Sequence, residues 1–293
     1  MMSIFWPTCP RRMATFSPAD PSLMCTLIVM HHQVPGVPLV VAANRDEYLD
    51  RLAAPPAIWD LSTDKCNQNT ILAPRDLRAG GTWLGLNSSN VFAALTNRPV
   101  PTPDTTRRSR GHLVLDALGY ESAGKAAAAF ESLRSDQYNP FNLLVADLNE
   151  AFTVVCNNGE VRVERLAAGV HVIGNAEPND AVHPKTNRVR VAAEALTSHS
   201  SIQILDGLAD LCRSHEGTES KIGPLGATCV HLDGYGTRSS ILLRLGEDAE
   251  QNELLHAEGA PCAHPYEDST ALLHELSQMA SYTGAGSIEG TVN

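Results

Sequence analysis

The pattern of apolar and polar positions predicts that the chain begins with two short buried strands. Residues 26–30 and 38–43 are apolar runs rich in Val, Ile and Leu, and they are bounded by a Pro-Gly pair and by Asn44-Arg45-Asp46-Glu47. Short apolar runs between turn-forming residues are typical of strands that are buried on both faces. We therefore expect a hairpin whose second strand ends directly in four polar residues.

The rest of the pattern consists of groups of strands and groups of helices. Because like elements come in runs rather than in strict alternation, the pattern favours an α+β fold of stacked antiparallel sheets covered by helices, in a single domain over residues 24–279. Helices are predicted at 109–118, after a cap at Ser122, and around 189–196 and 205–212. Further strands are predicted at 82–86, 91–96, 141–148, 151–156, 161–166, 170–173, 228–232, 239–245 and 253–257.

The two ends of the chain differ from this pattern. Residues 1–23 hold four prolines, two arginines and one acid, with no apolar stretch long enough for a signal peptide, and the prolines would break an amphipathic presequence helix. We expect a disordered leader or a start codon assigned too early. Residues 280–293 are rich in Gly, Ser and Thr and are predicted to form a flexible tail.

Composition and charge exclude several classes of function. Lys and Arg number 22 against 33 Asp and Glu, which gives a net charge of −11, and only 5% of the 293 residues are aromatic. A chain without a basic stripe or stacking aromatics is a poor nucleic-acid binder. It also lacks an apolar run of about 18 residues, so we expect no transmembrane segment.

The cysteines and histidines do not form a recognisable ligand motif. The seven cysteines stand at 9, 25, 66, 156, 212, 229 and 262, with no C-x-x-C pair, and no two of the eleven histidines are four residues apart beside a Glu. We expect a reduced protein with no metal site, located in the cytoplasm or alternatively in a mitochondrion. Most of the cysteines are then small packing residues, namely Cys66, Cys156, Cys212 and Cys229.

Two short stretches could carry chemistry. If translation begins at Met24, removal of the methionine leaves Cys25 as the first residue, with a thiol and an α-amine on one carbon. Since the amine has a pKa of about 8, it can accept the thiol proton near neutral pH. Arg45 and Asp46 could then lie partly buried beside it as an ion pair. From the residues alone, an ordinary turn and an ordinary packing cysteine remain open alternatives.

Longer blocks of sequence give the chain a family resemblance from Met24 to about Ala257. Asn44-Arg45-Asp46-Glu47 and Gly80-Gly81-Thr82-Trp83-Leu84-Gly85 are specific enough to identify it as a member of the NRDE family, also called the transport and Golgi organization protein 2 family. The match continues in order at Ala94–Arg98, Ser109–Gly111, Phe141–Leu144, Gly174–Ala176, Pro184-Lys185 and Tyr235–Ser240.

This resemblance implies a fold and a set of site residues. The fold is similar to that of the N-terminal nucleophile hydrolases, a four-layer αββα sandwich of two antiparallel sheets between helix layers. The chain departs from the pattern in two places, because residues 1–23 would block Cys25 unless they are removed, and because Gly174 precedes Asn175 where the family commonly has Ser. The catalytic residues implied by the matching motifs are Cys25, Arg45, Asp46, Asn97, Asn175 and Arg238.

Two functions follow from the resemblance. The first is cleavage of an amide bond in a small amphipathic ligand through Cys25, with no required cofactor. The alternative is a non-catalytic protein that handles haem or a lipid, since family members are linked to haem mobilisation, lipid homeostasis and Golgi organisation or secretion. In that alternative haem is a transported ligand, and the arginines meet carboxylates. A free amine on Cys25 is needed only for the first.

Overall fold

A computed structural model describes residues 25–61, 70–198, 200 and 203–284, and in this part of the chain two antiparallel sheets dominate. The six-stranded sheet has the order β10 (Gly169–Ile173), β1 (Thr26–Val34), β2 (Val37–Tyr48), β11 (Tyr235–Leu245), β12 (Glu253–Ala257) and β13 (Glu267–Asp268). The seven-stranded sheet has the order β3 (Ala53–Asp60), β4 (Thr70–Asp76), β5 (Leu84–Asn87), β6 (Phe92–Asn97), β7 (Phe141–Ala146), β8 (Ala151–Asn157) and β9 (Glu160–Leu166).

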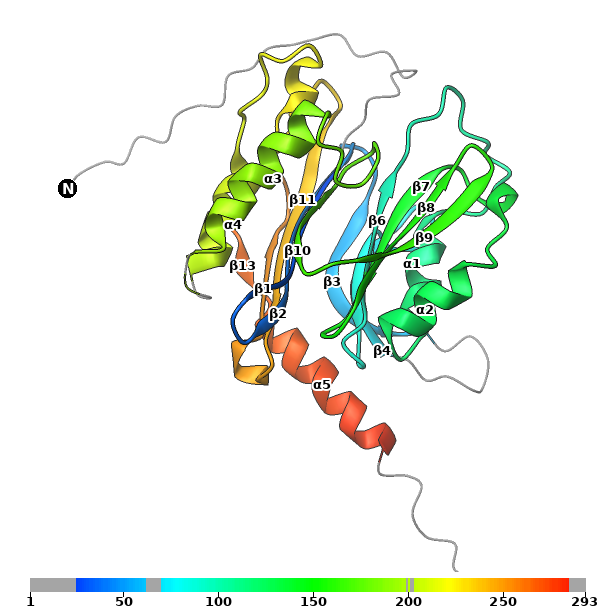
Figure 1. Cartoon of the computed structure of the whole chain (residues 1–293), viewed down its shortest axis with the longest axis vertical. Helices are drawn as coiled ribbons and strands as arrows, with labels where there is room; N and C mark the ends of the chain where they lie inside the picture. The colour runs from blue at the N-terminus through cyan, green and yellow to red at the C-terminus, as the bar shows by residue number, and fades with distance from the viewer. Residues whose placement is uncertain (1–24, 62–69, 199, 201–202, 285–293) are drawn as a thin grey trace, which may run out of the picture.

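Helices cover the outer face of each sheet, as Figure 1 shows. The six-stranded sheet packs against α3 (Pro184–Leu196) and α4 (Gln203–Arg213), and the seven-stranded sheet packs against α1 (Gly111–Leu118) and α2 (Ala123–Phe130). A third apolar core fills the space between the two sheets. The expected four-layer αββα sandwich is therefore confirmed.

Strand β2 shows why its sequence is an almost unbroken apolar run. Leu39 and Val41 point into the core between the sheets, while Val40 and Ala42 point toward α3 and α4. A strand that is buried on both faces needs apolar residues at successive positions, because side chains alternate between the two faces. The same alternation continues into the polar end of the strand, where it separates neighbouring charges.

Several elements differ from the prediction. Strand β3 was not expected because it contains Pro55 and Pro56, but it lies at the edge of its sheet, where proline is tolerated. Strand β4, which pairs with β3, was not expected either. The strand predicted at 228–232 is wrong: His231 makes only an isolated bridge to Gly236, and β11 begins earlier than expected, at Tyr235.

The C-terminal helix was also not predicted. Helix α5 (Thr270–Gly284) lies at one end of the sandwich (Figure 1), and its Leu273 and Leu276 belong to the core between the sheets. The helix continues into the first part of the segment that we expected to be a flexible tail. The rest of that segment, 285–293, and the whole predicted leader, 1–23, lie outside the described residues.

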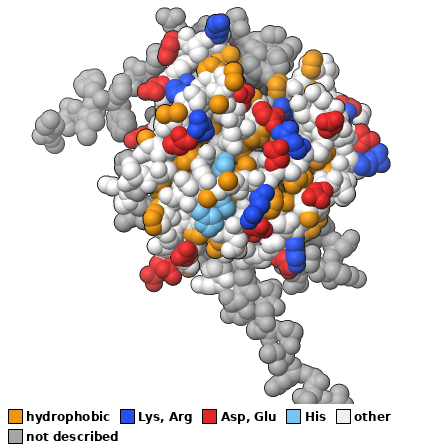
Figure 2. All heavy atoms as spheres, in the orientation of Figure 1, with side chains coloured by type: hydrophobic (Ala, Val, Ile, Leu, Met, Phe, Trp, Pro, Cys, Tyr) orange, Lys and Arg blue, Asp and Glu red, His pale blue; other side chains and the backbone are white. Residues whose placement is uncertain are grey.

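The surface and the helices show the following charge and length patterns. On the face drawn in Figure 2, acidic and basic side chains are interspersed rather than gathered into a basic stripe. Among the described residues, no helix has the length and apolarity needed to cross a bilayer.

Candidate active site

Cys25 lies where three strand ends meet. It directly precedes β1, which pairs Thr26 with Asn44 on one side and Leu27 with Ile173 on the other. Continuing these two registers places Arg45 and Asn175 on either side of Cys25. The Cys25 thiol Sγ lies 3.5 Å from the backbone oxygen of Asp46. The fold therefore brings segments 25, 45–46 and 175 together from distant parts of the sequence.

Arg45 points into the space between the sheets. Its guanidinium lies 4.2 Å from the centre of the Trp83 ring, and its Nη2 lies 3.8 Å from Glu47 Oε2. Only 6% of the residue is exposed, and burial lowers the pKa of its guanidinium. Arg45 thus forms its ion pair with Glu47, on its own face of β2, rather than with Asp46 as expected.

Asp46 points to the opposite face of β2. Its Oδ1 accepts a hydrogen bond of 2.6 Å from the hydroxyl of Thr237, while its Oδ2 is buried and has no hydrogen-bond partner among the described residues. Burial raises the pKa of this carboxyl to about 7, although Lys185, the bond from Thr237 and His231 act in the opposite direction. The carboxylate therefore has one oxygen left to accept a donor.

The Cys25 thiol is not ionised in the chain as given. Burial raises its pKa to about 12, and the charge of Asp46 adds to this effect more than the charge of Arg45 opposes it. In this chain the Cys25 nitrogen forms a peptide bond with Met24, so it is an amide and not a base. Cys25 can become a nucleophilic thiolate only if its burial, the nearby charges or the peptide bond to Met24 changes.

Asn175 faces Asn97 across the two sheets. The side chain of Asn175 is 5% exposed, its Nδ2 donates to the backbone oxygen of Asn97, and its Oδ1 is buried without a partner among the described residues. Asn97 ends β6 and is itself exposed. The structure thus brings Asn175 to Cys25, whereas Asn97 contributes its main chain to this contact.

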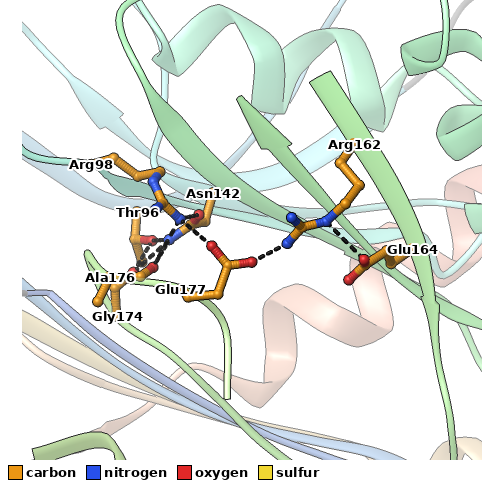
Figure 3. A network of polar contacts seen from close by, with 8 residues as sticks. All are labelled: Thr96, Arg98, Asn142, Arg162, Glu164, Gly174, Ala176 and Glu177. Carbon is orange, nitrogen blue, oxygen red and sulfur yellow. Dashed lines mark hydrogen bonds and ion pairs between the residues drawn. The ribbon is translucent and has the colours of Figure 1, made fainter. Parts of the chain in front are cut away.

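Figure 3 shows how the loop that carries Asn175 is held. The Thr96 hydroxyl donates to the backbone oxygen of Gly174 at 2.5 Å, and Asn142 Nδ2 donates to the backbone oxygens of Gly174 and Ala176 at 2.9 and 2.8 Å. Asn142 is completely buried. Two side chains of the seven-stranded sheet therefore fix the main chain on both sides of Asn175.

A chain of charges extends this network toward the surface (Figure 3). Arg98 Nη1 donates to Asn142 Oδ1 at 3.0 Å and pairs with Glu177 Oε2 at 3.1 Å. Glu177 also pairs with Arg162, whose Nε lies 2.7 Å from Glu164. These contacts orient the Asn142 amide, and they involve no contact with Cys25.

Arg238 occupies a different position from the other predicted residues. Strand β11 pairs Thr237 with Asp46 and Ser239 with Arg45, so Arg238 is the extra residue of a β-bulge. Its Nη1 lies 3.7 Å from Glu258 Oε1. The bulge brings Thr237 opposite Asp46, while the ion pair of Arg238 is directed toward the end of β12.

Three further residues belong to this site although no role was predicted for them. Lys185 is 3% exposed, and burial lowers the pKa of its ammonium while Asp46 raises it. Burial lowers the pKa of Arg110 to about 10, with Cys25 and Glu47 acting against that shift. Thr237 is the donor to Asp46. All three stand inside motifs that carried the family resemblance, which was the available signal.

The arrangement combines a thiol, a carboxylate with a vacant acceptor, and buried cations. Such a set can stabilise negative charge on the oxygen of a carbonyl group and transfer a proton to or from a group bonded to the same carbon. The apolar cavity between the sheets, lined by Leu72, Leu84, Ile241, Leu243 and Leu273 among others, has about 20 Å³ of room for water-sized molecules. That is room for about one water, and the lining includes none of Cys25, Arg45 and Asp46, so this cavity is not the binding space of the candidate site.

The described residues form a four-layer αββα sandwich in which Cys25 directly precedes strand β1 of the six-stranded sheet. The chain belongs to the Transport and Golgi organisation 2 family, whose model matches residues 24–254. It is 28% identical over 234 residues to the Transport and Golgi organization protein 2 homolog of Homo sapiens. The match covers 72% of this chain and 83% of the human protein.

Solved structures similar to the chain are more distant. One is the Caenorhabditis elegans ortholog of N-acylethanolamine-hydrolyzing acid amidase, with a TM-score of 0.49, 15% identity and coverage of 75% of this chain and 92% of that one. Another is penicillin V acylase from Agrobacterium tumefaciens, with a TM-score of 0.49, 13% identity and coverage of 84% and 98%.

Proposed function

We propose that this protein is a cysteine amide hydrolase that becomes active when residues 1–24 are absent and Cys25 is the first residue. The observation that carries this proposal is the buried Oδ2 of Asp46, which has no hydrogen-bond partner among the described residues. A buried carboxylate oxygen without a donor is costly. The Cys25 Sγ lies 3.5 Å from the backbone oxygen of Asp46, and the charge of Asp46 raises the pKa of the Cys25 thiol, so an α-ammonium on Cys25 is the donor that we propose for this oxygen.

The first half of the reaction forms a thioester. The α-amine of Cys25 takes the proton of the thiol, and the thiolate attacks the carbonyl carbon of the substrate amide. The negative charge passes to the carbonyl oxygen of a tetrahedral intermediate. The intermediate then collapses, the carbon–nitrogen bond breaks, and the α-ammonium gives its proton to the leaving amine.

The second half restores the enzyme. Water attacks the thioester carbon, and the α-amine of Cys25 accepts a proton from that water. The carbon–sulfur bond then breaks, the acid product leaves, and the α-ammonium returns its proton to the sulfur. Asp46 orients the amine throughout, because its free oxygen accepts from it. Arg45, Arg110 and Asn175 stabilise the thiolate and the oxyanion, since they bring positive charge and a buried amide close to Cys25.

The substrate class follows from charge and space. Partly buried arginines favour a ligand that carries a carboxylate or another anionic group. The cavity between the sheets is too small for an acyl chain. A small amphipathic amide that lies across the mouth of the site, with its polar end toward Arg45 and Arg110, satisfies both conditions.

The test compares two chains, the full sequence and a chain that starts at Cys25, released from a cleavable fusion. Peptide mass spectrometry after a short iodoacetamide pulse at neutral pH reports which cysteines react. We expect Cys25 to react fastest in the shorter chain and slowly in the full chain, because the raised thiol pKa persists only in the latter. A panel of N-acyl amides should be cleaved by the shorter chain alone.

Matched variants make this result specific. Cys25→Ser should remove cleavage, since a hydroxyl is a much weaker nucleophile, while Cys212→Ser, at a buried cysteine of α4, should retain it. Slow alkylation of Cys25 in both chains, together with no cleavage, would refute the hydrolase.

A second candidate function rests on the full chain. With the amide bond to Met24 intact, the neutral thiol favours a non-catalytic protein of the cytoplasm or a mitochondrion that binds haem or a lipid through its carboxylates. This candidate predicts that hemin or a fatty acid binds the full chain and that Arg110→Ala weakens the binding. It also predicts that neither chain cleaves any amide.

A further inference from the structure

Four side chains that bind soft metals meet beside the candidate active site. His215 follows α4, Cys229 and His231 lie in the segment before β11, and Cys262 lies in the turns after β12. Each offers one ligand atom, and these atoms all lie within 4.8 Å of one another. Two thiols and two imidazoles from three segments that are far apart in the sequence therefore lie next to one another.

The distances suit a small tetrahedral ion. His231 Nε2 lies 3.1 Å from Cys262 Sγ and 3.5 Å from Cys229 Sγ, and the rings of His215 and His231 stack with their centres 5.1 Å apart. In a tetrahedral site with Zn–S of about 2.3 Å and Zn–N of about 2.0 Å, neighbouring ligand atoms are about 3.3–3.8 Å apart. Small side-chain rotations therefore suffice to surround an ion.

One main-chain hydrogen bond and one from an arginine side chain connect the three segments independently of the four candidate ligands. The Cys229 amide donates to the backbone oxygen of Ser214 at 2.9 Å, which ties the segment before β11 to the end of α4. Arg213 Nε donates to the backbone oxygen of Pro261 at 3.3 Å, which ties the end of α4 to the turns after β12. Cys229 is 1% exposed, so one ligand lies inside the fold. The cluster is held by the scaffold rather than by the rotamers of mobile side chains.

We propose that His215, Cys229, His231 and Cys262 form a structural Zn²⁺ site. Two thiolates and two imidazoles are the ligands that Zn²⁺ prefers over the harder Mg²⁺ and Ca²⁺. Four protein ligands leave no coordination position for water or substrate. The ion therefore connects the loops that carry its ligands and does not take part in a reaction. The two thiols release their protons when the ion binds.

The sequence analysis could not find this site, and its expectation of no metal overlooked these residues. The ligands are separated by 14, 2 and 31 positions, which matches no common zinc spacing. Cys229, for which the sequence predicts a packing role, is one of the four ligands. The cluster exists only because the loops after α4, before β11 and after β12 are adjacent in the fold.

The ion would also act on the candidate active site. The Val230 amide donates to the Thr237 hydroxyl at 2.9 Å, and the Thr237 amide donates to the Val230 oxygen at 2.9 Å. Since Cys229 and His231 flank Val230, a bound ion fixes the segment that holds Thr237. Thr237 in turn donates to Asp46. The zinc site is therefore a positioning device for Asp46, and it stands whether or not the protein is a hydrolase.

The test uses the full chain, purified with reductant, stripped with a chelator and titrated with zinc sulfate against a chromophoric competitor. We expect one Zn²⁺ per chain by elemental analysis. Replacement by Co²⁺ should give the thiolate-to-metal charge-transfer bands and the intense visible bands of a tetrahedral ion. Urea unfolding should show a stabilisation by zinc that is lost on chelation.

Variants at the less buried ligands keep the test independent of folding. Cys262→Ser and His215→Ala should weaken Zn²⁺ binding by roughly a hundredfold with an unchanged far-ultraviolet spectrum. Cys25→Ser and His274→Ala, which lie outside the cluster, should bind like the parent chain. Equal zinc binding by Cys262→Ser and the parent would overturn the proposal. So would a Cys229–Cys262 disulfide without zinc in protein alkylated at cell lysis, because the pair would then be a redox couple.

Discussion

Arg45 and Asp46 are neighbours in the sequence but belong to different environments. Because successive side chains of β2 point to opposite faces, Arg45 contacts Trp83 and Glu47 between the sheets. Asp46 accepts a hydrogen bond from Thr237 on the side of the helices. Each buried charge must be stabilised from its own face. A polar motif at the end of a strand that is buried on both faces therefore places Arg45 and Asp46 in two separate environments. Cys25 lies beside the strand at this point.

The first prediction concerns the proton of Asp46 in the full chain. Burial raises the carboxyl pKa to about 7 in the folded state, against about 4 in the unfolded state. Between these pH values the folded chain binds a proton that the unfolded chain has released, so stability falls as the pH rises through this window. Asp46→Asn lacks this titration. Its unfolding free energy relative to the parent should increase from about pH 4 to about pH 7, by up to roughly 4 kcal/mol.

Urea titrations of the two chains at several pH values measure this difference. Lys185 and His231 are the other titratable groups that act on Asp46, and Asp46 raises the pKa of both in return, so the measured difference includes their response as well as the proton of Asp46. Asp50→Asn, at an exposed aspartate, should follow the parent at every pH. A difference between Asp46→Asn and the parent that does not change with pH would show that Asp46 is ionised throughout.

At the scale of elements, the sequence predicted the pieces that have a local signature. The apolar runs gave β1, β2 and the sheet strands, and the polar end of β2 indicated where chemistry could lie. The bulge at Arg238 could not be predicted, because one extra residue in a strand leaves the apolar alternation nearly intact. The placement of Asn175 opposite Cys25 depends on the pairing of β10 with β1, which only the fold determines.

The second prediction concerns the loop that carries Asn175. Asn142→Ala removes one of two donors to the backbone oxygen of Gly174, which keeps Thr96, and one of two donors to that of Ala176, which keeps Arg98. We expect a loss of roughly 2 kcal/mol in unfolding free energy and faster hydrogen exchange of residues 174–177. Asn149→Ala, at an exposed asparagine, serves as the matched control and should change neither quantity. Unchanged exchange in Asn142→Ala would show that the loop is held by other contacts.

The third prediction concerns α5, which the sequence analysis missed because its apolar positions follow a polar turn near the end of the chain. Leu276 is 2% exposed and lies in the core between the sheets, whereas Met279 is 38% exposed on the same helix. Leu276→Ala should cost roughly 2–5 kcal/mol, through lost apolar contact and the cavity that remains. Met279→Ala should cost less than roughly 1 kcal/mol. Similar losses by denaturant titration would mean that the helix does not close this end of the sandwich.

At the scale of the whole molecule, the sandwich places the candidate site where the start of β1 meets the ends of β2 and β10. Residues 1–23 hold four prolines and lie before the family match, which starts at residue 24, so we expect their removal to leave the melting temperature within a few degrees. A chain of this size that loses several kcal/mol should melt about ten degrees lower, which calorimetry would detect. Such a drop would show that these residues pack on the domain.

The last prediction joins this scale to the proton of Asp46. A chain that starts at Cys25 has an α-ammonium beside Asp46, and that charge should lower the carboxyl pKa from about 7 toward its ordinary value. The loss of stability between about pH 4 and about pH 7 should then be smaller than in the full chain. Asp46→Asn introduced into both chains should bring their pH profiles together, because the carboxylate that senses the amine is gone. Urea titrations of the four proteins measure this coupling without any substrate. Profiles of the two parent chains that superimpose would place the amine away from Asp46, and the base of the proposed hydrolase would then lack the group that orients it.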